Sequence, residues 1–134
     1  MLGHDELEAV AREVIDFGFQ IHHALGPGLL ENAYEALLES ALIQAGYKVQ
    51  RQVPIRMKFK GVVVDNAFKI DLLINGGLVV ELKSIERLAP VHYKQVLTYL
   101  RLMNLPLGIL MNFGQAMFKD GVKRVANEYR GPFG

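Results

Sequence analysis

The sequence has 134 residues, of which 51% are apolar and 22% are charged, and it contains no cysteine. This length and composition predict one globular domain over residues 1–134 and exclude a disordered chain. The lack of cysteine excludes a disulfide framework, thiolate metal sites and thiol catalysis. No apolar run approaches the ~20 residues of a membrane span, and the first residues are acidic and polar, so we expect a cytoplasmic protein with no membrane contact.

The charges are distributed unevenly along the chain. Residues 1–46 carry one basic and eight acidic side chains, whereas residues 47–134 carry fourteen basic and six acidic ones. A basic half can attract a polyanion even when the net charge is only +1. The alternative is that the acidic helices face solvent or pair with the basic half, and charge alone favours nucleic acid only slightly.

The first 46 residues predict two helices. Apolar residues recur at three- and four-residue spacing from Glu6 to Leu25, which is typical of an amphipathic helix. The segment Gly26-Pro27-Gly28 interrupts this pattern. A second helix is predicted from Leu29 to Ala45, and Gly46 is expected to end it in a left-handed conformation.

The period then changes to that of β-strands. Apolar residues alternate with polar ones from Val53 to Phe59, which predicts a half-buried strand followed by a turn at Lys60-Gly61. Extended runs follow at residues 62–64 and 68–74, either as one strand or as two.

The remaining elements alternate between strand and helix. Asn75-Gly76-Gly77 is a hairpin signal before an aliphatic strand, Leu78 to Lys83. Pro90 begins a helix that extends to about Asn104. Strands are predicted at residues 107–113 and 122–126, and residues 130–134 are expected to be loose. The order αα-βββ-α-β-β, with one more strand if the two extended runs are separate, predicts an α/β sandwich with a mixed β-sheet flanked by helices.

Three charged residues, Asp71, Glu81 and Lys83, interrupt strands that otherwise have an interior composition. Burying an unpaired charge costs several kcal/mol, so such residues usually mark a strand end, an ion pair or a site. Glu81 and Lys83 are two residues apart, which places both on one face of a strand.

The length of the hairpin loop decides whether Asp71 joins this pair. A three-residue loop pairs Ile74 with Leu78 and places Asp71 opposite Glu81, with ~5 Å between the Cβ atoms. A two-residue loop would place Asp71 opposite Leu82. The paired glycines favour the longer loop, because one of them can adopt the left-handed conformation.

Two facing carboxylates repel unless a cation or a proton lies between them, and such oxygen ligands suit Mg²⁺ or Mn²⁺. A nearby lysine could hold the attacking water and offset the charge of a phosphate. The alternative is an ion pair of Lys83 with either carboxylate at the sheet edge. Spacing alone does not separate the two interpretations.

The pattern D-x₉-E-x-K, after a strand and before a helix, resembles the PD-(D/E)xK nuclease superfamily. Within it, the chain resembles the GxxExxY proteins, whose naming motif is found at Gly28, Glu31 and Tyr34. The likeness continues through the segments DLLI, VVELK, VHYKQVLTYL and LMNFG and covers roughly residues 21–125. The proline that often precedes the aspartate is replaced by Ile70, as it is in many members.

This resemblance implies a restriction-endonuclease-like fold and metal-dependent hydrolysis of phosphodiester bonds in nucleic acid, with DNA as the expected substrate. It implies that Asp71 and Glu81 hold Mg²⁺ or Mn²⁺, together with the Leu82 carbonyl and Glu31. Lys83 would position and activate the water. The products would carry a 5′-phosphate and a 3′-hydroxyl.

Supporting residues are predicted on the second helix and at the end of the first. At ~100° per residue, Glu31 falls on the apolar face, and Glu35 and Glu39 are expected to face away. Tyr34 is expected in the core, and its hydroxyl could be tied to the site. His22 is a candidate for supporting the site or contacting a phosphate, although a lone histidine there is more often a core residue.

On the later helix, His92, Gln95 and Tyr99 share one arc. Gln95 resembles the glutamine that many superfamily members place beside the Glu-x-Lys strand, and we expect it to support the site. Tyr99 is expected to be structural, and His92 is left open. The strand residues Arg51, Arg56, Lys58 and Lys60 could follow a phosphate backbone, but solvent-facing charges on strands are ordinary, and that interpretation is favoured.

Three functions are compatible with these observations. The first is a nuclease acting on DNA ends, flaps or damaged strands. The second is a structure-selective junction endonuclease that acts as a homodimer. The third is a retained fold that binds nucleic acid or a protein partner without catalysis; the complete set of Asp71, Glu81 and Lys83 argues against it.

Overall fold

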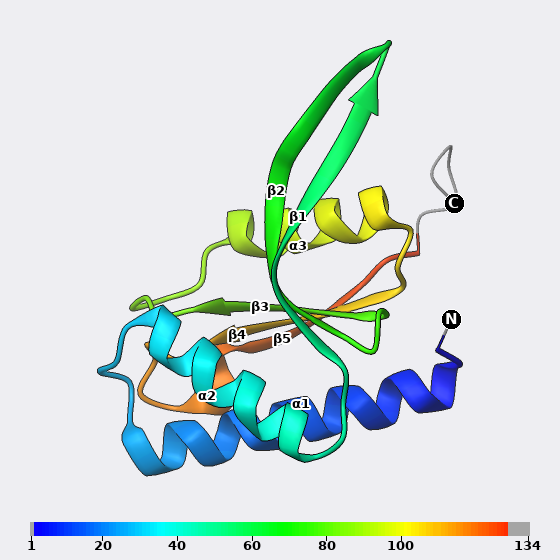
Figure 1. The fold of residues 1–134 in the computed structure, drawn as a ribbon. Coiled ribbons are helices and arrows are strands. Elements are labelled where there is room, and N and C mark those ends of the chain that lie inside the picture. The colour runs from blue at the N-terminus through cyan, green and yellow to red at the C-terminus, as the bar shows by residue number, and fades with distance from the viewer. Residues whose placement is uncertain (1, 129–134) are drawn as a thin grey trace.

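The structure is a computed structural model that describes residues 2–128, so the tail predicted to be loose lies outside the described residues. A mixed β-sheet separates two helical layers (Figure 1). The elements are α1 (His4–Leu25), α2 (Glu31–Gln44), β1 (Val49–Phe59), β2 (Val62–Ile74), β3 (Leu78–Lys83), α3 (Pro90–Met103), β4 (Leu107–Asn112), the 3₁₀-helix η1 (Phe118–Gly121) and β5 (Val122–Ala126).

The sheet has the strand order β1-β2-β3-β4-β5 in the described part of the chain. Strands β3 and β4 are parallel, and the other neighbouring pairs are antiparallel. Parallel neighbours need a crossover connection, and α3 provides it. This arrangement confirms the predicted α/β sandwich, a mixed sheet flanked by helices in the order αα-βββ-α-β-β.

Each face of the sheet has its own apolar core. Leu72, Val80 and Leu82 pack with α1 and α2 residues, whereas Leu73 and Val79 pack with α3 residues. Because the central strands are covered on both faces, β3 is apolar at successive positions and a charge within it is unfavourable. Figure 1 shows the two helical layers, with α1 and α2 on one side of the sheet and α3 on the other.

The strand boundaries differ from the predicted ones in β1 and β2. Strand β1 begins at Val49, four residues before the predicted start, and the two extended runs of residues 62–64 and 68–74 form one strand, β2. The pairing of β1 with β2 shifts by two residues between Ile55 and Met57. Such a bulge absorbs extra residues and bends the ribbon, which is why a polar stretch could remain within one strand.

The turns mostly follow the predicted chemistry. Gly46 (φ 95°) ends α2 in the left-handed region, and Ile74 pairs with Leu78 across the three-residue loop, in which Asn75 and Gly76 have φ of 50° and 68°. Between α1 and α2, however, Gly26 has positive φ (74°) and Gly28 does not. The left-handed position in this turn is therefore at Gly26.

None of the helices in residues 2–128 is long and apolar enough to cross a membrane.

We expect Gly114→Ala to destabilise the protein by at least about 2 kcal/mol, because an added Cβ would lie 2.2 Å from the Ile85 carbonyl oxygen, a backbone atom that cannot move alone. Gly28→Ala is the matched control, since a Cβ there meets nothing within 4 Å, and its effect should remain within about 0.5 kcal/mol. Urea unfolding measures both. Equal stability of the two variants would contradict this packing.

Candidate active site

Asp71, Glu81 and Lys83 lie where the pairing of β2 with β3 ends. The paired residues run from Ile74↔Leu78 to Leu72↔Val80, so Asp71 and Glu81 are the next residues on the two strands, and they lie close enough to interact electrostatically. At this point the Asp71 side chain replaces the strand backbone as an acceptor: its Oδ2 accepts a hydrogen bond from the Leu82 N–H at 2.8 Å. The three-residue hairpin loop thus places the two carboxylates together, as the sequence predicted.

Glu81 is buried and only half satisfied. Its side chain receives a hydrogen bond from Lys83, with 3.2 Å between Nζ and Oε2, while its Oε1 is buried without a hydrogen-bond partner among the described residues. Glu81 is 5% exposed, so water does not solvate this oxygen freely. An unpaired buried carboxylate oxygen costs free energy and calls for a proton or a cation.

The electrostatics of Glu81 agree with this geometry. Burial, followed by the negative charge of Asp71, raises the pKa of Glu81 to about 8, while Lys83 acts in the opposite direction. The two carboxyl groups are close enough to share a hydrogen bond, which forms only when one of them carries a proton. With both ionised, Glu81 Oε1 has no donor, and the pair is suited to binding a cation.

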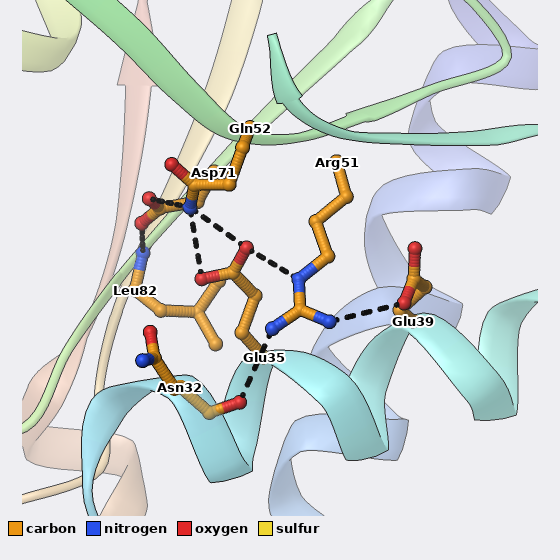
Figure 2. Close-up of polar contacts among 7 residues, drawn as sticks. All are labelled: Asn32, Glu35, Glu39, Arg51, Gln52, Asp71 and Leu82. Atoms are coloured by element: carbon orange, nitrogen blue, oxygen red, sulfur yellow. Dashed lines mark hydrogen bonds and ion pairs between the residues drawn. The ribbon is translucent and has the colours of Figure 1, made fainter.

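A third carboxylate, Glu35 of α2, lies beside this pair. Glu35 is 1% exposed and accepts hydrogen bonds from Gln52 Nε2 at 2.8 and 3.1 Å and from Arg51 Nε at 2.9 Å. The same Gln52 amide donates to Asp71 Oδ1 at 3.2 Å. Figure 2 shows the Gln52 amide between the two carboxylates, with Arg51 on the far side of Glu35 reaching Glu39.

The expectation that Glu35 faces away was wrong. At ~100° per residue, Glu35 lies only ~20° from Leu42 around the helix, so the apolar face already contained it. Arg51 is exposed, as expected, but its guanidinium also compensates this buried carboxylate, which the sequence pattern did not predict. The helical spacing of Glu35 with Leu38 and Leu42 is the signal that could have identified it.

Gln52 has an unusual backbone. Its φ is 53°, in the left-handed region, within a strand where extended angles are the rule. The neighbouring residues Arg51 and Val53 pair regularly with β2, but Gln52 does not. Strained residues of this kind cluster at functional sites, and here the strain directs the amide toward Asp71 and Glu35.

The model of the PD-(D/E)XK nuclease superfamily matches residues 8–125. The chain belongs to this superfamily. No match was found among curated proteins. That Asp71, Glu81 and Lys83 are the aspartate, the glutamate and the lysine of the superfamily's name stays a prediction.

In this PD-(D/E)XK chain, Glu31 lies beside the carboxylates at the first turn of α2. Burial raises the pKa of Glu31, the charge of Asp71 raises it further, and the charge of Lys83 lowers it. Glu31 is thus within electrostatic range of both residues. Among residues 2–128, however, no group of three or more histidine, aspartate or glutamate side chains could already hold a metal ion. Coordination by Glu31 therefore stays a prediction.

Helix α3 borders the site through Tyr99. Burial raises the pKa of Tyr99, and the charges of Glu81 and Asp71 raise it further, so this hydroxyl lies near the pair. Gln95 is exposed and acts on the pKa of Tyr99 in the opposite direction. The Tyr99 ring stacks on Phe68 with 4.1 Å between centroids. His92 Nδ1 accepts a hydrogen bond from the Ala89 N–H at 2.9 Å and thereby caps α3.

Tyr34 and His22 organise the loops around the site. The Tyr34 hydroxyl donates to the Gly26 carbonyl and accepts from the Leu29 N–H at 3.1 Å, which closes the turn between α1 and α2. Ser84, next to Lys83, donates to the Leu29 carbonyl at 2.8 Å and fastens this turn to the end of β3. His22 Nε2 lies 2.8 Å from the Gln115 carbonyl oxygen, a core contact.

We expect Glu81→Gln to be more stable than the native protein in metal-free buffer above pH 8. The pKa of Glu81 rises from 4.5 to about 8 on folding, so the folded protein binds more protons than the unfolded chain between these values. Its free energy of unfolding therefore falls as the pH rises through this interval. The neutral side chain of Glu81→Gln does not lose stability in this way. The free energy of unfolding of the variant should therefore exceed that of the native protein by roughly 2–4 kcal/mol at pH 8.5.

Urea unfolding in EDTA between pH 4 and 9 measures this difference, which should vanish near pH 4. Glu86→Gln, at an exposed position, is the control and should follow the native curve. A native protein that stays the more stable at pH 8.5 would contradict the desolvation of Glu81.

Proposed function

We propose that the protein hydrolyses phosphodiester bonds in nucleic acid with a divalent metal ion, and that DNA is its substrate. The observation that supports this most is the buried, unpaired Oε1 of Glu81 beside Asp71, with the Lys83 ammonium 3.2 Å from the other oxygen of Glu81. An ion pair maintained only for stability would satisfy both oxygens, as Arg51 and Gln52 do for Glu35.

The residues present fit Mg²⁺ or Mn²⁺. Hard divalent ions prefer carboxylate and carbonyl oxygens, and Asp71 and Glu81 supply two adjacent carboxylates. We propose that these two hold the ion, with the Leu82 carbonyl and Glu31 as further ligands. Bound there, the ion would act as a Lewis acid on the phosphate and lower the pKa of a water molecule.

The other side chains act on the water and the phosphate. Lys83 carries a positive charge next to the carboxylates and is partly exposed, so its ammonium can orient the attacking water and offset charge on the phosphorus oxygens. Gln95 and Tyr99 border the pair from α3 and would support Lys83 or a phosphate. The fourteen basic residues of the second half would add attraction for a polyanion.

Cleavage is tested on duplex, single-stranded, flap and four-way-junction DNA and on RNA, with Mg²⁺ or Mn²⁺. We expect native protein to cut DNA and Glu81→Ala and Lys83→Ala to lose about 10²–10⁴-fold in rate, because each removes a group that acts on the reacting atoms. Lys119→Ala, an exposed lysine on η1, is the matched control and should cut normally. Cutting that survives both site substitutions would indicate a contaminating nuclease, and no cutting at all would favour a binding module.

Metal binding has a readout that does not depend on cleavage. At pH 8, Mn²⁺ should raise the thermal midpoint of the native protein, because it binds the folded state; an excess of 100 times Kd corresponds to about 2.7 kcal/mol. Asp71→Ala and Glu81→Gln should show little shift at the same concentration, whereas Glu86→Gln should respond like the native protein. Equal shifts in all four proteins would mean that the ion binds elsewhere.

A further inference from the structure

The outer half of the β1–β2 hairpin extends beyond both helical layers. This distal ribbon, residues 56–65, begins at the bulge between Ile55 and Met57 and ends in the turn at Lys60 and Gly61. All of its residues except Met57 are exposed. Figure 1 shows the ribbon projecting past α3, away from the sheet.

The strand register divides the ribbon into two faces. Phe59 pairs with Val62 and Met57 pairs with Val64, so these four apolar side chains share one face. Phe59 and Val62, the last pair before the turn, are 64% and 63% exposed. A two-stranded ribbon is marginally stable by itself, and an uncovered apolar tip indicates a binding surface.

The other face, which also carries the exposed Val63 opposite Lys58, and the turn hold the basic residues of the ribbon. Arg56 is neutralised by Asp65 at 2.9 Å, and Asp65 is the single acidic residue of the ribbon. Lys58 lies on the same face, and the Nζ of Lys60 lies 5.5 Å from the centroid of the Phe59 ring. Two positive charges therefore flank the apolar tip without an acid in the ribbon to compensate them.

We propose that the distal ribbon binds duplex DNA, with Lys58 and Lys60 on phosphates and the Phe59–Val62 tip against the bases. This inference rests on the proposed function for its choice of nucleic acid. The major groove of B-DNA is about 12 Å wide and admits a two-stranded ribbon, whereas the deep major groove of duplex RNA does not. Apolar side chains at a protruding tip can also press between base steps.

The length of the ribbon allows one DNA duplex to contact both the candidate active site and the ribbon tip. Gln52, which bonds to Asp71, and Lys60 lie on the same strand and its turn, eight residues apart. At 3.3 Å per residue this separation is about 26 Å, or about eight base pairs at 3.4 Å each. A duplex cut at Asp71 and Glu81 would therefore meet the tip within one helical turn.

The first test measures binding of a labelled 30-base-pair duplex in EDTA, by anisotropy at several KCl concentrations. The double variant Lys58→Gln, Lys60→Gln should lower the slope of log K against log salt by about 1.8 and weaken binding about tenfold or more near 0.1 M salt. The control Lys119→Gln, Lys123→Gln removes two exposed lysines of η1 and β5, outside the ribbon, with the same change in charge. Equal losses in both double variants would overturn the proposal, because binding would then be a general effect of charge.

The second test uses tryptophan, which the native sequence lacks. Phe59→Trp places one reporter at the tip, and Phe19→Trp places one at an exposed aromatic position on α1. We expect duplex DNA to quench the emission at position 59, through stacking on bases, and to leave that at position 19 unchanged. No quenching at position 59 with bound DNA would overturn the contact of the tip with bases.

Two further outcomes distinguish DNA binding by the ribbon from self-association and from a failure of catalysis. If the ribbon instead pairs two copies of the chain, sedimentation would show a dimer that the double variant Phe59→Ser, Val62→Ser dissociates, while the lysine double variant binds DNA normally. That result would overturn the proposal.

Failure of the proposed nuclease function gives a different result: the duplex still binds and still quenches the tryptophan at position 59, but it is not cleaved. If the ribbon variants cleave DNA and bind it like the native protein, the proposed contact of the ribbon is refuted, whereas the proposed nuclease function is not.

Discussion

The structure depends on one unfavourable contact, the two buried carboxylates of Asp71 and Glu81 at adjacent strands. Like charges in a dry environment repel, and the chain offsets this only in part. Asp71 accepts hydrogen bonds from the Leu82 N–H and the Gln52 amide, and Glu81 accepts one from Lys83. One oxygen of Glu81 has no hydrogen-bond donor among the described residues. This cost to stability is the physical reason for the metal site that we propose at Asp71 and Glu81.

Glu35 provides the contrast within the same few ångströms. It is as deeply buried as Glu81, yet Arg51 and Gln52 satisfy it, and it positions the Gln52 amide against Asp71. The two glutamates therefore have different roles: one connects α2 to β1, and the other offers an open oxygen. The strained backbone of Gln52 links these roles, since its conformation directs one amide to both carboxylates.

The supports around the site are local hydrogen bonds. Tyr34 closes the turn between α1 and α2, and Ser84 ties that turn to the strand that carries Lys83. These hydrogen bonds give Tyr34 of the Gly28–Tyr34 motif a structural role, so no part in catalysis is needed to account for it. The same two strands that hold Gln52 and Asp71 continue outward, past the bulge between Ile55 and Met57, as the distal ribbon.

Much of the fold and the centre of the site could be predicted from the sequence by itself. Helical spacing, the Asn75-Gly76-Gly77 turn and the proline at the start of α3 depend on neighbours in the chain, and the turn length by itself gave the pairing of Ile74 with Leu78. The tertiary structure decided what depends on distant elements. It decided that Gln52 is strained and donates to Glu35, and that Phe59 and Val62 at the ribbon tip stay exposed, although Leu102 of α3 lies beside one strand of the ribbon. The strain at Gln52 and the exposure of the ribbon tip depend on how distant elements pack, and no local pattern of residues determines them, whereas helical spacing already places Glu35 on the apolar face of α2.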